Sequence, residues 1–146
     1  MFNFWARREQ NYLQSPEISH SGPKVMLING WSGSGGDAFP HYFKKAGLGK
    51  LIGKRTLGGL IGIGGFPKLI DGGYVTTPNH AFLDTSGNWD IEGYGVSPDY
   101  EVENISNESP DKNDPQLDRA IEVIMELVSK EELIEPELPE YPDRSN

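Results

Sequence analysis

The stretch Asn29-Gly-Trp-Ser-Gly-Ser34-Gly-Gly-Asp37 follows directly on the apolar run Val25-Met-Leu-Ile28, and this junction decides how the chain folds. The apolar run predicts a buried, parallel strand, and the glycine-rich stretch leads into a predicted helix. The first amides of a helix have no backbone partners, so they can hold a developing negative charge beside a serine oxygen. Ser34 is therefore predicted to be a nucleophile. The alternative is a glycine-rich loop in which Ser34 only caps the helix.

Composition favours a loop-rich α/β or β-rich protein of one domain. The 146 residues include 18 glycines and 11 prolines, only 36% are hydrophobic, and the mean hydropathy is −0.53. A net charge of −9 argues against nucleic acid or an anionic membrane surface as the main partner. Without cysteine, the chain has neither disulfides nor thiolate metal sites.

The sequence indicates a compartment only by default. Its longest apolar stretch is too short to span a bilayer, and the first ten residues lack the basic-then-apolar pattern of a signal peptide. A complete chain would then be cytoplasmic, whereas a parent protein with an upstream signal would be periplasmic. Phe2, Phe4 and Trp5 favour a fragment, because nothing nearby in sequence would cover them.

Between residues 35 and 102 the sequence predicts one helix and several short strands joined by glycine-rich loops. The first helix runs from residue 35 or 36 to 46, with Asp37 in its first turn, Pro40 within it and Gly47 as its stop. A second strand is predicted within 48–55, and a glycine-rich loop over 56–65. Further short strands are predicted at 69–70, 74–77 and 81–83, with turns at 71–73 and 86–88, followed by a connection over 89–99 and an extended segment at 100–102.

The last helix has the clearest start signal. Asp114 is its predicted N-cap and Pro115 its first residue. Its predicted core face consists of Leu117, Ala120, Ile121, Ile124 and Val128. Residues 131–146 are acidic and proline-rich, which predicts an extended tail lying on a surface or on a neighbouring subunit.

Nucleotide and metal sites are poorly supported. Gly62-Ile-Gly-Gly-Phe-Pro67 has proline where a dinucleotide fingerprint needs its third glycine, and Gly53-Lys-Arg55 lacks the spacing of a phosphate-binding loop. Asp37 and His41 lie four residues apart on one predicted helix and could hold a metal. Because no third ligand accompanies them, a surface salt link is favoured, and no metal or cofactor is expected.

A serine nucleophile needs a general base and profits from an acid. The histidines at 20, 41 and 80 do not stand in a recognisable catalytic setting, and His41 would point away from the Ser34 hydroxyl. Glu92, beside Ile91 and Gly93, is the best acidic candidate, because flanking glycine lets a carboxylate turn inward to a polar partner. Its alternative is an exposed loop glutamate.

Four motifs in this order carry a family resemblance that covers roughly Pro23 to Arg144. They are residues 29–40, the turn-containing segment Gly47–Gly59, Glu92-Gly-Tyr-Gly-Val-Ser-Pro-Asp99, and Asp114-Pro-Gln-Leu with its proline-rich tail. Together they resemble the C-terminal part of the catalytic domain of tricorn-type serine peptidases, relatives of the C-terminal processing proteases. The resemblance implies an incomplete crotonase-like α/β superhelical core over residues 1–130 and a tail over 131–146.

The resemblance also assigns roles at the site. Ser34 matches the family nucleophile, and the amide of Gly35 would supply one oxyanion contact. Glu92 matches the acid that completes a network of hydroxyl and carboxylate groups behind the catalytic histidine. Some relatives have aspartate where this chain has Gly35, so Asp37 is the weak candidate for the lost substrate contact. The implied partner is an oligopeptide substrate, bound by a parent protein that forms a homo-oligomer.

Two departures from the processing proteases bear on the mechanism. Glycine follows in the turn Thr56-Leu-Gly-Gly59 where a Ser/Lys enzyme carries its lysine, which leaves a histidine-based mechanism. In tricorn relatives that histidine lies well upstream of any residue in this chain, so the isolated chain is expected to be nearly inactive. The two rivals are a non-catalytic crotonase-like module that binds peptides or scaffolds an assembly, and a complete site with His80 or His20 as base.

Overall fold

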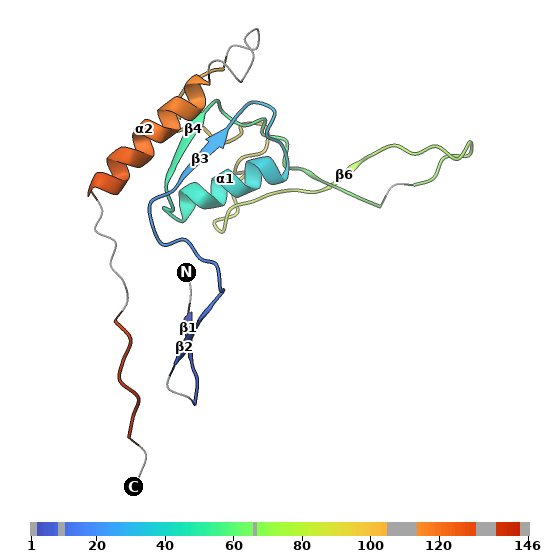
Figure 1. Ribbon diagram of the computed structural model, residues 1–146. Coiled ribbons are helices and arrows are strands. Elements are labelled where there is room, and N and C mark those ends of the chain that lie inside the picture. Colours follow the sequence, from blue (N-terminus) through green and yellow to red (C-terminus); the bar gives the residue numbers. More distant parts are fainter. Residues whose placement is uncertain (1–2, 9–10, 66, 105–113, 131–136, 144–146) are drawn as a thin grey trace.

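A three-stranded parallel sheet forms the centre of the computed structural model, which describes residues 3–8, 11–65, 67–104, 114–130 and 137–143 (Figure 1). The order of its strands is β3 (Val25–Ile28), β4 (Lys50–Gly53), β7 (Tyr100–Glu101). Helix α1 (Gly35–Lys45) connects β3 to β4, and helix α2 (Pro115–Lys130) follows β7 in the chain. The predictions of an α/β fold, of a parallel strand at 25–28 and of a helix to its C-terminal side are confirmed. The strand is less buried than predicted: Ile28 is buried, but Leu27 is exposed.

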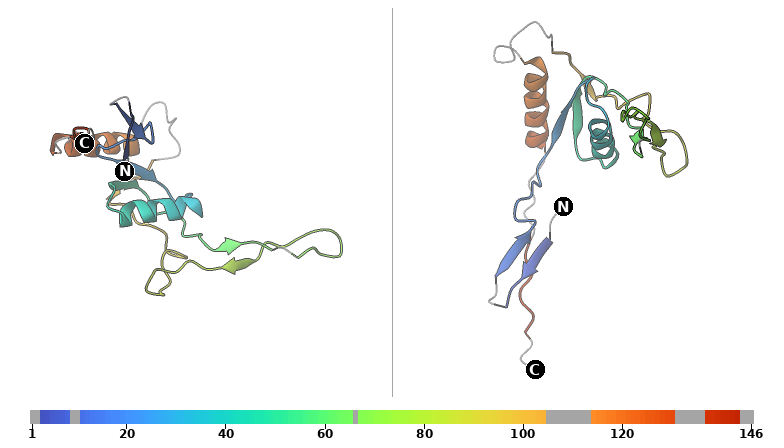
Figure 2. Two further views of the ribbon diagram at one scale, coloured as in Figure 1. Left: turned by 90° about the horizontal axis from the view of Figure 1, so that it is seen from below. Right: turned by 90° about the vertical axis from the view of Figure 1, so that its right-hand side faces the viewer.

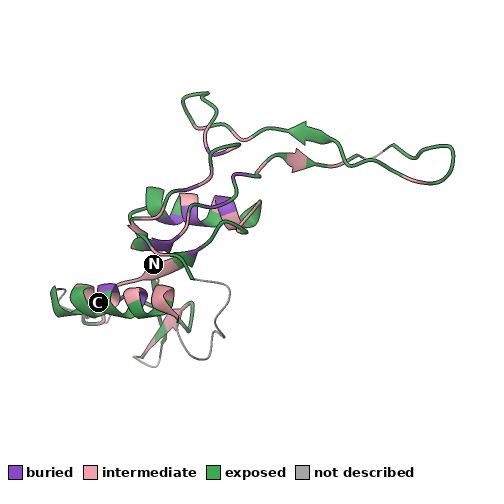
Figure 3. Cartoon of the chain, turned by 90° about the horizontal axis from the view of Figure 1, so that it is seen from above, coloured by how far each residue is buried: buried purple, intermediate pink, exposed green. Residues whose placement is uncertain are grey.

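The two helices lie on opposite faces of this sheet (Figure 2). Leu51 and Ile52, neighbours in β4, are both fully buried and belong to different core clusters, because successive side chains of a strand point to opposite faces. One cluster includes Ile28, Phe43, Leu51, Ile91 and Val96, and the other includes Ile52, Ala120 and Val123. Figure 3 shows that burial concentrates on the sheet and on the inward faces of the helices.

Helix α2 starts as predicted. The Asp114 carboxylate accepts hydrogen bonds from the Leu117 amide at 2.9 Å and from Asn104 Nδ2 at 2.9 Å. These bonds, the Leu117 amide first, lower the pKa of Asp114. The stabilisation from this cap is therefore present above the ordinary aspartate pKa and is lost as the pH falls through the lowered one.

The predicted core face of α2 is confirmed at Ala120 but wrong at Leu117, Ile121 and Val128. Leu117, Ile121 and Val128 are exposed by 45%, 50% and 49%, whereas Ala120 and Val123 are buried. Gln116 supplies the reason, since its Nε2 donates to the carbonyl of Ile28 at 2.8 Å and to the carbonyl of Ile52 at 2.9 Å. Anchored to the ends of β3 and β4, the helix turns its 116, 120, 123 and 127 row toward the sheet.

The turn between β3 and α1 holds Ser34 in an unusual backbone conformation. Its φ of 54° and ψ of −112° make it the one non-glycine residue with positive φ in the described part of the chain. The Ser34 carbonyl accepts the first helical bonds, from the amides of Asp37 and Ala38, each at 2.9 Å. The helix runs on through Pro40, and Gly47, at a φ of 63°, follows its end.

Two loops at the carboxyl edge of the sheet pair with one another. The Thr56 amide donates to the Val96 carbonyl at 3.1 Å, and the Val96 amide donates to Thr56 Oγ1 at 2.7 Å. One turn further along, the Gly93 amide donates to the Gly58 carbonyl at 2.7 Å. Gly95 lies so close that a Cβ built on it would stand 2.2 Å from the Thr56 carbonyl oxygen, so only glycine fits there.

An arm extends from the paired loops away from the sheet (Figure 1). It contains the antiparallel strands β5 (Gly62–Ile63) and β6 (Pro78–His80) and turns at Gly72 and Gly87. The predicted turns are confirmed, but the strands predicted at 69–70, 74–77 and 81–83 are wrong: single bridges join Lys68 to Tyr74 and Leu83 to Trp89. The arm is mostly exposed, so no neighbouring surface supports longer ladders there (Figure 3).

The described part of the tail packs on an N-terminal hairpin formed by β1 (Asn3–Ala6) and β2 (Tyr12–Ser15). The Tyr141 hydroxyl donates to the Asn11 carbonyl at 2.7 Å, and the Tyr12 and Tyr141 rings lie 5.1 Å apart. Phe2 and residues 131–136 and 144–146 of the predicted tail lie outside the described residues. No helix among the described residues is long and apolar enough to cross a bilayer.

Replacing Gly95 by alanine should lower the free energy of unfolding by more than about 2 kcal/mol, because the methyl group adds a collision to the positive-φ penalty. Gly47→Ala is the matched control: its φ is also positive, but a Cβ there meets no atom within 4 Å. The control should lose only about 1–2 kcal/mol. Urea unfolding of both variants measures the difference, and equal losses would contradict the close approach of the two loops.

Ser34→Gly should be more stable than Ser34→Ala by about 1 kcal/mol. Glycine removes a backbone strain of about 1–3 kcal/mol at this φ, against about 0.5–1 kcal/mol of added chain entropy in the unfolded state. Both variants lack the hydroxyl, so the difference between their urea midpoints reports the backbone alone. An alanine variant that is equally or more stable would rule out a strained turn.

Candidate functional site

Ser34 is exposed, and its hydroxyl does not cap helix α1. Its side chain forms no capping hydrogen bond, and its amide donates to the Gly59 carbonyl at 2.8 Å. Ser32, the other serine of the motif, instead donates its hydroxyl hydrogen to Asn29 Oδ1 at 3.3 Å. The structure therefore contradicts the alternative in which Ser34 serves only as a cap. A strained strand-to-helix turn of this kind is how a nucleophile is presented in many hydrolases.

The amide of Gly35 is available beside this hydroxyl. The amides of Ser34, Gly36, Asp37 and Ala38 all donate to backbone carbonyls, whereas that of Gly35 donates to no group among the described residues. Gly35 itself is exposed, and a Cβ built on it meets no atom within 4 Å. A free N–H at the positive end of a helix is suited to an oxyanion.

Glu92 is held by the loop that follows β4. It follows the buried Ile91, is itself half-buried, and its Oε2 accepts a hydrogen bond from the Leu60 amide at 2.6 Å. The carboxylate is thus turned inward to a polar partner. An exposed loop glutamate, the alternative considered from sequence, would not have this contact.

One peptide group links Ser34 and Glu92. The Gly59–Leu60 peptide accepts the Ser34 amide on its oxygen and donates to Glu92 through its nitrogen. Two hydrogen bonds and the two bonds of this peptide group separate the Ser34 nitrogen from Glu92 Oε2, so these atoms lie at most about 8 Å apart. Residues separated widely in the sequence therefore meet at one site.

Asp37 does not lie on the substrate side. Its side chain is wholly buried, and its two oxygens accept hydrogen bonds from the Gly58 amide at 2.8 Å and from the Gly59 amide at 2.9 Å. The expectation that Asp37 contacts substrate is therefore corrected, because a buried and fully engaged carboxylate cannot reach a bound peptide. The sequence carries no signal that the Gly58-Gly59 turn would lie opposite this residue.

The structure brings none of the three histidines, all of which it describes, within hydrogen-bonding distance of the Ser34 hydroxyl. His41 Nε2 lies 3.3 Å from Asp90 Oδ2, and its ring packs against Phe82. His20 contacts the Pro23 carbonyl at 3.2 Å before β3, and His80 lies on the arm. The salt link predicted between Asp37 and His41 is wrong, because Asp37 binds two glycine amides and His41 contacts Asp90.

A metal site at this pair is not formed by the described side chains. The Asp37 carboxylate is occupied by two amides, and His41 points to Asp90. Across the described residues, no three histidine, aspartate or glutamate side chains gather as a metal would require.

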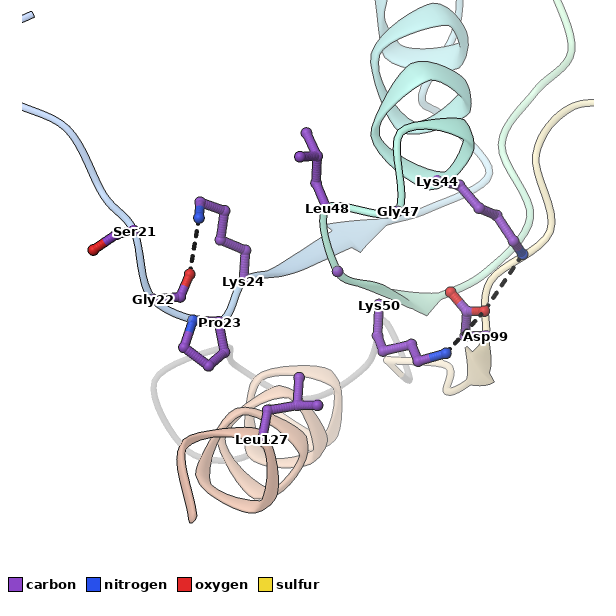
Figure 4. A pocket seen from close by; sticks show the side chains of 11 residues that line it. Ser21, Gly22, Pro23, Lys24, Lys44, Gly47, Leu48, Lys50, Asp99 and Leu127 are labelled. Carbon is purple, nitrogen blue, oxygen red and sulfur yellow. Dashed lines mark hydrogen bonds and ion pairs between the residues drawn. The ribbon is translucent and has the colours of Figure 1, made fainter. Parts of the chain in front are cut away.

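The lysines at the amino-terminal edge of the sheet bind partners that lie away from Ser34. A cavity of about 560 Å³ lies at the amino-terminal edge of the sheet, opposite the edge that carries Ser34, and three lysines border it (Figure 4). Lys44 and Lys50 share Asp99 there, at 3.6 and 4.0 Å, and Lys24 donates to the Gly22 carbonyl. This cavity is therefore separate from the candidate site.

Lys54 lies at the end of β4 and pairs with Glu101 at 2.9 Å and Glu103 at 3.2 Å. The hydrogen bond to Glu101, followed by that to Glu103, raises the pKa of Lys54 and keeps its amine protonated. A Ser/Lys mechanism needs a neutral lysine as base. The pairing of Lys54 therefore fits the absence of a Ser/Lys motif from the sequence.

Comparisons with a family model, with known proteins and with solved structures all point to one protein family. Residues 5–102 match the model of peptidase family S41. Tricorn protease of Thermoplasma acidophilum is 43% identical over 111 residues, which cover 76% of this chain and 10% of that protein. A tricorn protease homolog of Saccharolobus solfataricus is 42% identical over 107 residues, covering 72% and 10%.

The fold agrees as well. The crystal structure of the tricorn protease matches with a TM-score of 0.71 at 40% identity, covering 86% of this chain and 12% of that one. The chain thus spans about 10% of the length of these curated relatives. The matched region contains Ser34, Gly35 and Glu92. On this evidence the chain belongs to peptidase family S41, among relatives of tricorn protease.

Proposed function

We propose that this chain supplies the nucleophile half of a serine peptidase site, with Ser34 as nucleophile, the Gly35 amide as one oxyanion donor and Glu92 as the orienting acid. The observation that carries the proposal is the exposed Ser34 hydroxyl, which caps no helix and is followed by the free Gly35 amide, on a residue whose own amide is linked to Glu92 through one peptide group. The name of the relatives, tricorn protease, supports peptides as the substrate class.

The chemistry needs one group that this chain does not bring to the site. Ser34 Oγ attacks the carbonyl carbon of the scissile bond while a base takes the hydroxyl proton, and the carbonyl oxygen becomes an oxyanion beside the Gly35 amide. When the tetrahedral intermediate collapses, the C–N bond breaks and the protonated base gives its proton to the leaving amine. Water then attacks the acyl carbon while the base takes a proton from it. The base returns that proton to Ser34 Oγ as the C–O bond breaks and the acid product leaves.

The base is proposed to be a histidine from sequence outside this chain. None of the three described histidines reaches Ser34, and Lys54, which follows β4 at the carboxyl edge of the sheet, is held protonated. By resemblance, the same upstream sequence brings a second oxyanion amide. Glu92, fixed by the Leu60 amide, would complete the network behind that histidine.

The surface of the chain supports a larger catalytic domain. The sheet has three strands, α2 exposes Leu117, Ile121 and Met125 along one side, and the arm exposes Leu69 and Ile70. Apolar faces of this extent ordinarily mark contact with further protein. We therefore assign residues 1–130 to an incomplete crotonase-like core and 131–146 to a tail, in a parent protein that assembles as a homo-oligomer.

A non-catalytic peptide-binding or scaffolding module is the less favoured function. It would keep Ser34 as a helix cap, and the hydroxyl does not serve as one.

The test compares this chain with a protein extended upstream through the proposed histidine, using a fluorogenic peptide and a fluorophosphonate probe. The extended protein should hydrolyse the peptide and carry the probe on Ser34, and Ser34→Ala should abolish both. The chain alone should be at least about 10²–10³-fold slower, since one oxyanion donor alone contributes that much. Comparable activity in both would refute the half-site, and an extended protein that never labels would refute the peptidase.

A further inference from the structure

The turn Gly58-Gly-Leu60 is held by carboxylates at three consecutive amides. Asp37 Oδ1 accepts from Gly58 at 2.8 Å and Asp37 Oδ2 from Gly59 at 2.9 Å, while Glu92 Oε2 accepts from Leu60 at 2.6 Å. Hydrogen bonds between amides and ionised carboxylates are stronger than neutral ones. Two acids, one from α1 and one from the loop before β7, therefore fix a turn that has no regular secondary structure of its own.

Asp37 does this from a fully buried position. None of its side chain is exposed, and none of the ion pairs among the described residues includes it. Burial of a charge without a counterion is unfavourable unless hydrogen bonds and dipoles replace the water. The two glycine amides and the first turn of α1 provide that replacement here. The Asp37 carboxylate is thus stabilised by its hydrogen bonds to this turn.

The turn carries the geometry of the proposed site. Its Gly59–Leu60 peptide accepts the amide of Ser34 and donates to the carboxylate of Glu92. A shift of this peptide would move the strained Ser34 backbone and the Glu92 carboxylate relative to each other. Misplacement of reacting groups by about 1 Å can reduce a catalytic rate about 10²-fold.

We infer that Asp37 is a positioning residue of the hydrolytic site, one that fixes the Gly59–Leu60 peptide and through it the relation of Ser34 to Glu92. The inference rests on the proposed function, since positioning has meaning only for a site that reacts. It replaces the substrate contact expected from sequence. Asp37 touches no substrate and acts through the turn alone.

Asp37→Asn in the full-length parent protein tests this. Asparagine keeps the size of the side chain, but its NH₂ group would face one of the two glycine amides, donor against donor. We expect kcat on a fluorogenic peptide and the rate of fluorophosphonate labelling to fall at least about 10-fold, with KM changed less than about 3-fold. The reason is that the turn positions the reacting groups and does not form the substrate-binding cleft.

Asp99→Asn is the matched control. Asp99 also accepts a backbone amide, that of Leu51 at 2.9 Å, and also holds a residue of α1, Lys44, but at the opposite edge of the sheet. It should lower the melting temperature while kcat stays within about 2-fold of wild type. If Asp37→Asn does not fold, Asp37→Ser decides on the same criteria, because its hydroxyl can accept one amide without opposing the other.

The outcomes separate the two proposals. A wild-type protein that labels, with an Asp37 variant that folds and labels at the wild-type rate, overturns the inference and leaves the peptidase standing. An Asp37 variant whose KM rises while kcat is kept also overturns it, in favour of a substrate contact. A wild-type protein that does not label overturns both.

Discussion

The Gly59–Leu60 peptide group is the constraint on which the rest of the site depends. Its oxygen accepts the Ser34 amide and its nitrogen donates to Glu92, so it joins the turn after β3 to the loop before β7. The pairing of Thr56 with Val96 holds the loop after β4, which contains this peptide, against the loop before β7. The close approach at Gly95 leaves no room for a side chain between the two loops. Without this contact, Ser34 and Glu92, the proposed nucleophile and acid, would belong to unrelated loops.

The sheet supplies the frame for that contact. Parallel strands end at the same edge, so the turns that follow β3 and β4 lie together there. The chain before β7 reaches the same place through the bonds of Val96 to Thr56 and of Gly93 to Gly58. Gln116 of α2 closes the frame by donating to the last carbonyls of β3 and β4. In this chain a helix on one face of the sheet thus fixes the strands, and the turn that leads into the helix on the other face presents Ser34 and the free Gly35 amide.

Sequence signals that act locally predicted the junction well. The apolar run before Asn29 and the glycines around Ser34 define strand, turn and helix start, and Asp114 with Pro115 defines the start of α2. The face of α2 was missed because hydrophobic periodicity does not register the bonds of Gln116 to strand carbonyls. The strands predicted in the arm were wrong, because an alternating apolar and polar pattern does not by itself supply the neighbouring surface that a β-ladder needs. The role of Asp37 depends on a turn 21 residues away, which spacing cannot indicate.

A crystal structure of the extended protein, with a phosphonate bound covalently to Ser34, tests the central claim most directly. The account predicts a phosphonyl oxygen about 2.7–3.1 Å from the Gly35 nitrogen, with Glu92 Oε2 still on the Leu60 amide and a histidine from upstream sequence beside Ser34 Oγ. A phosphonyl oxygen turned away from Gly35, or a Glu92 carboxylate released from Leu60, would contradict it.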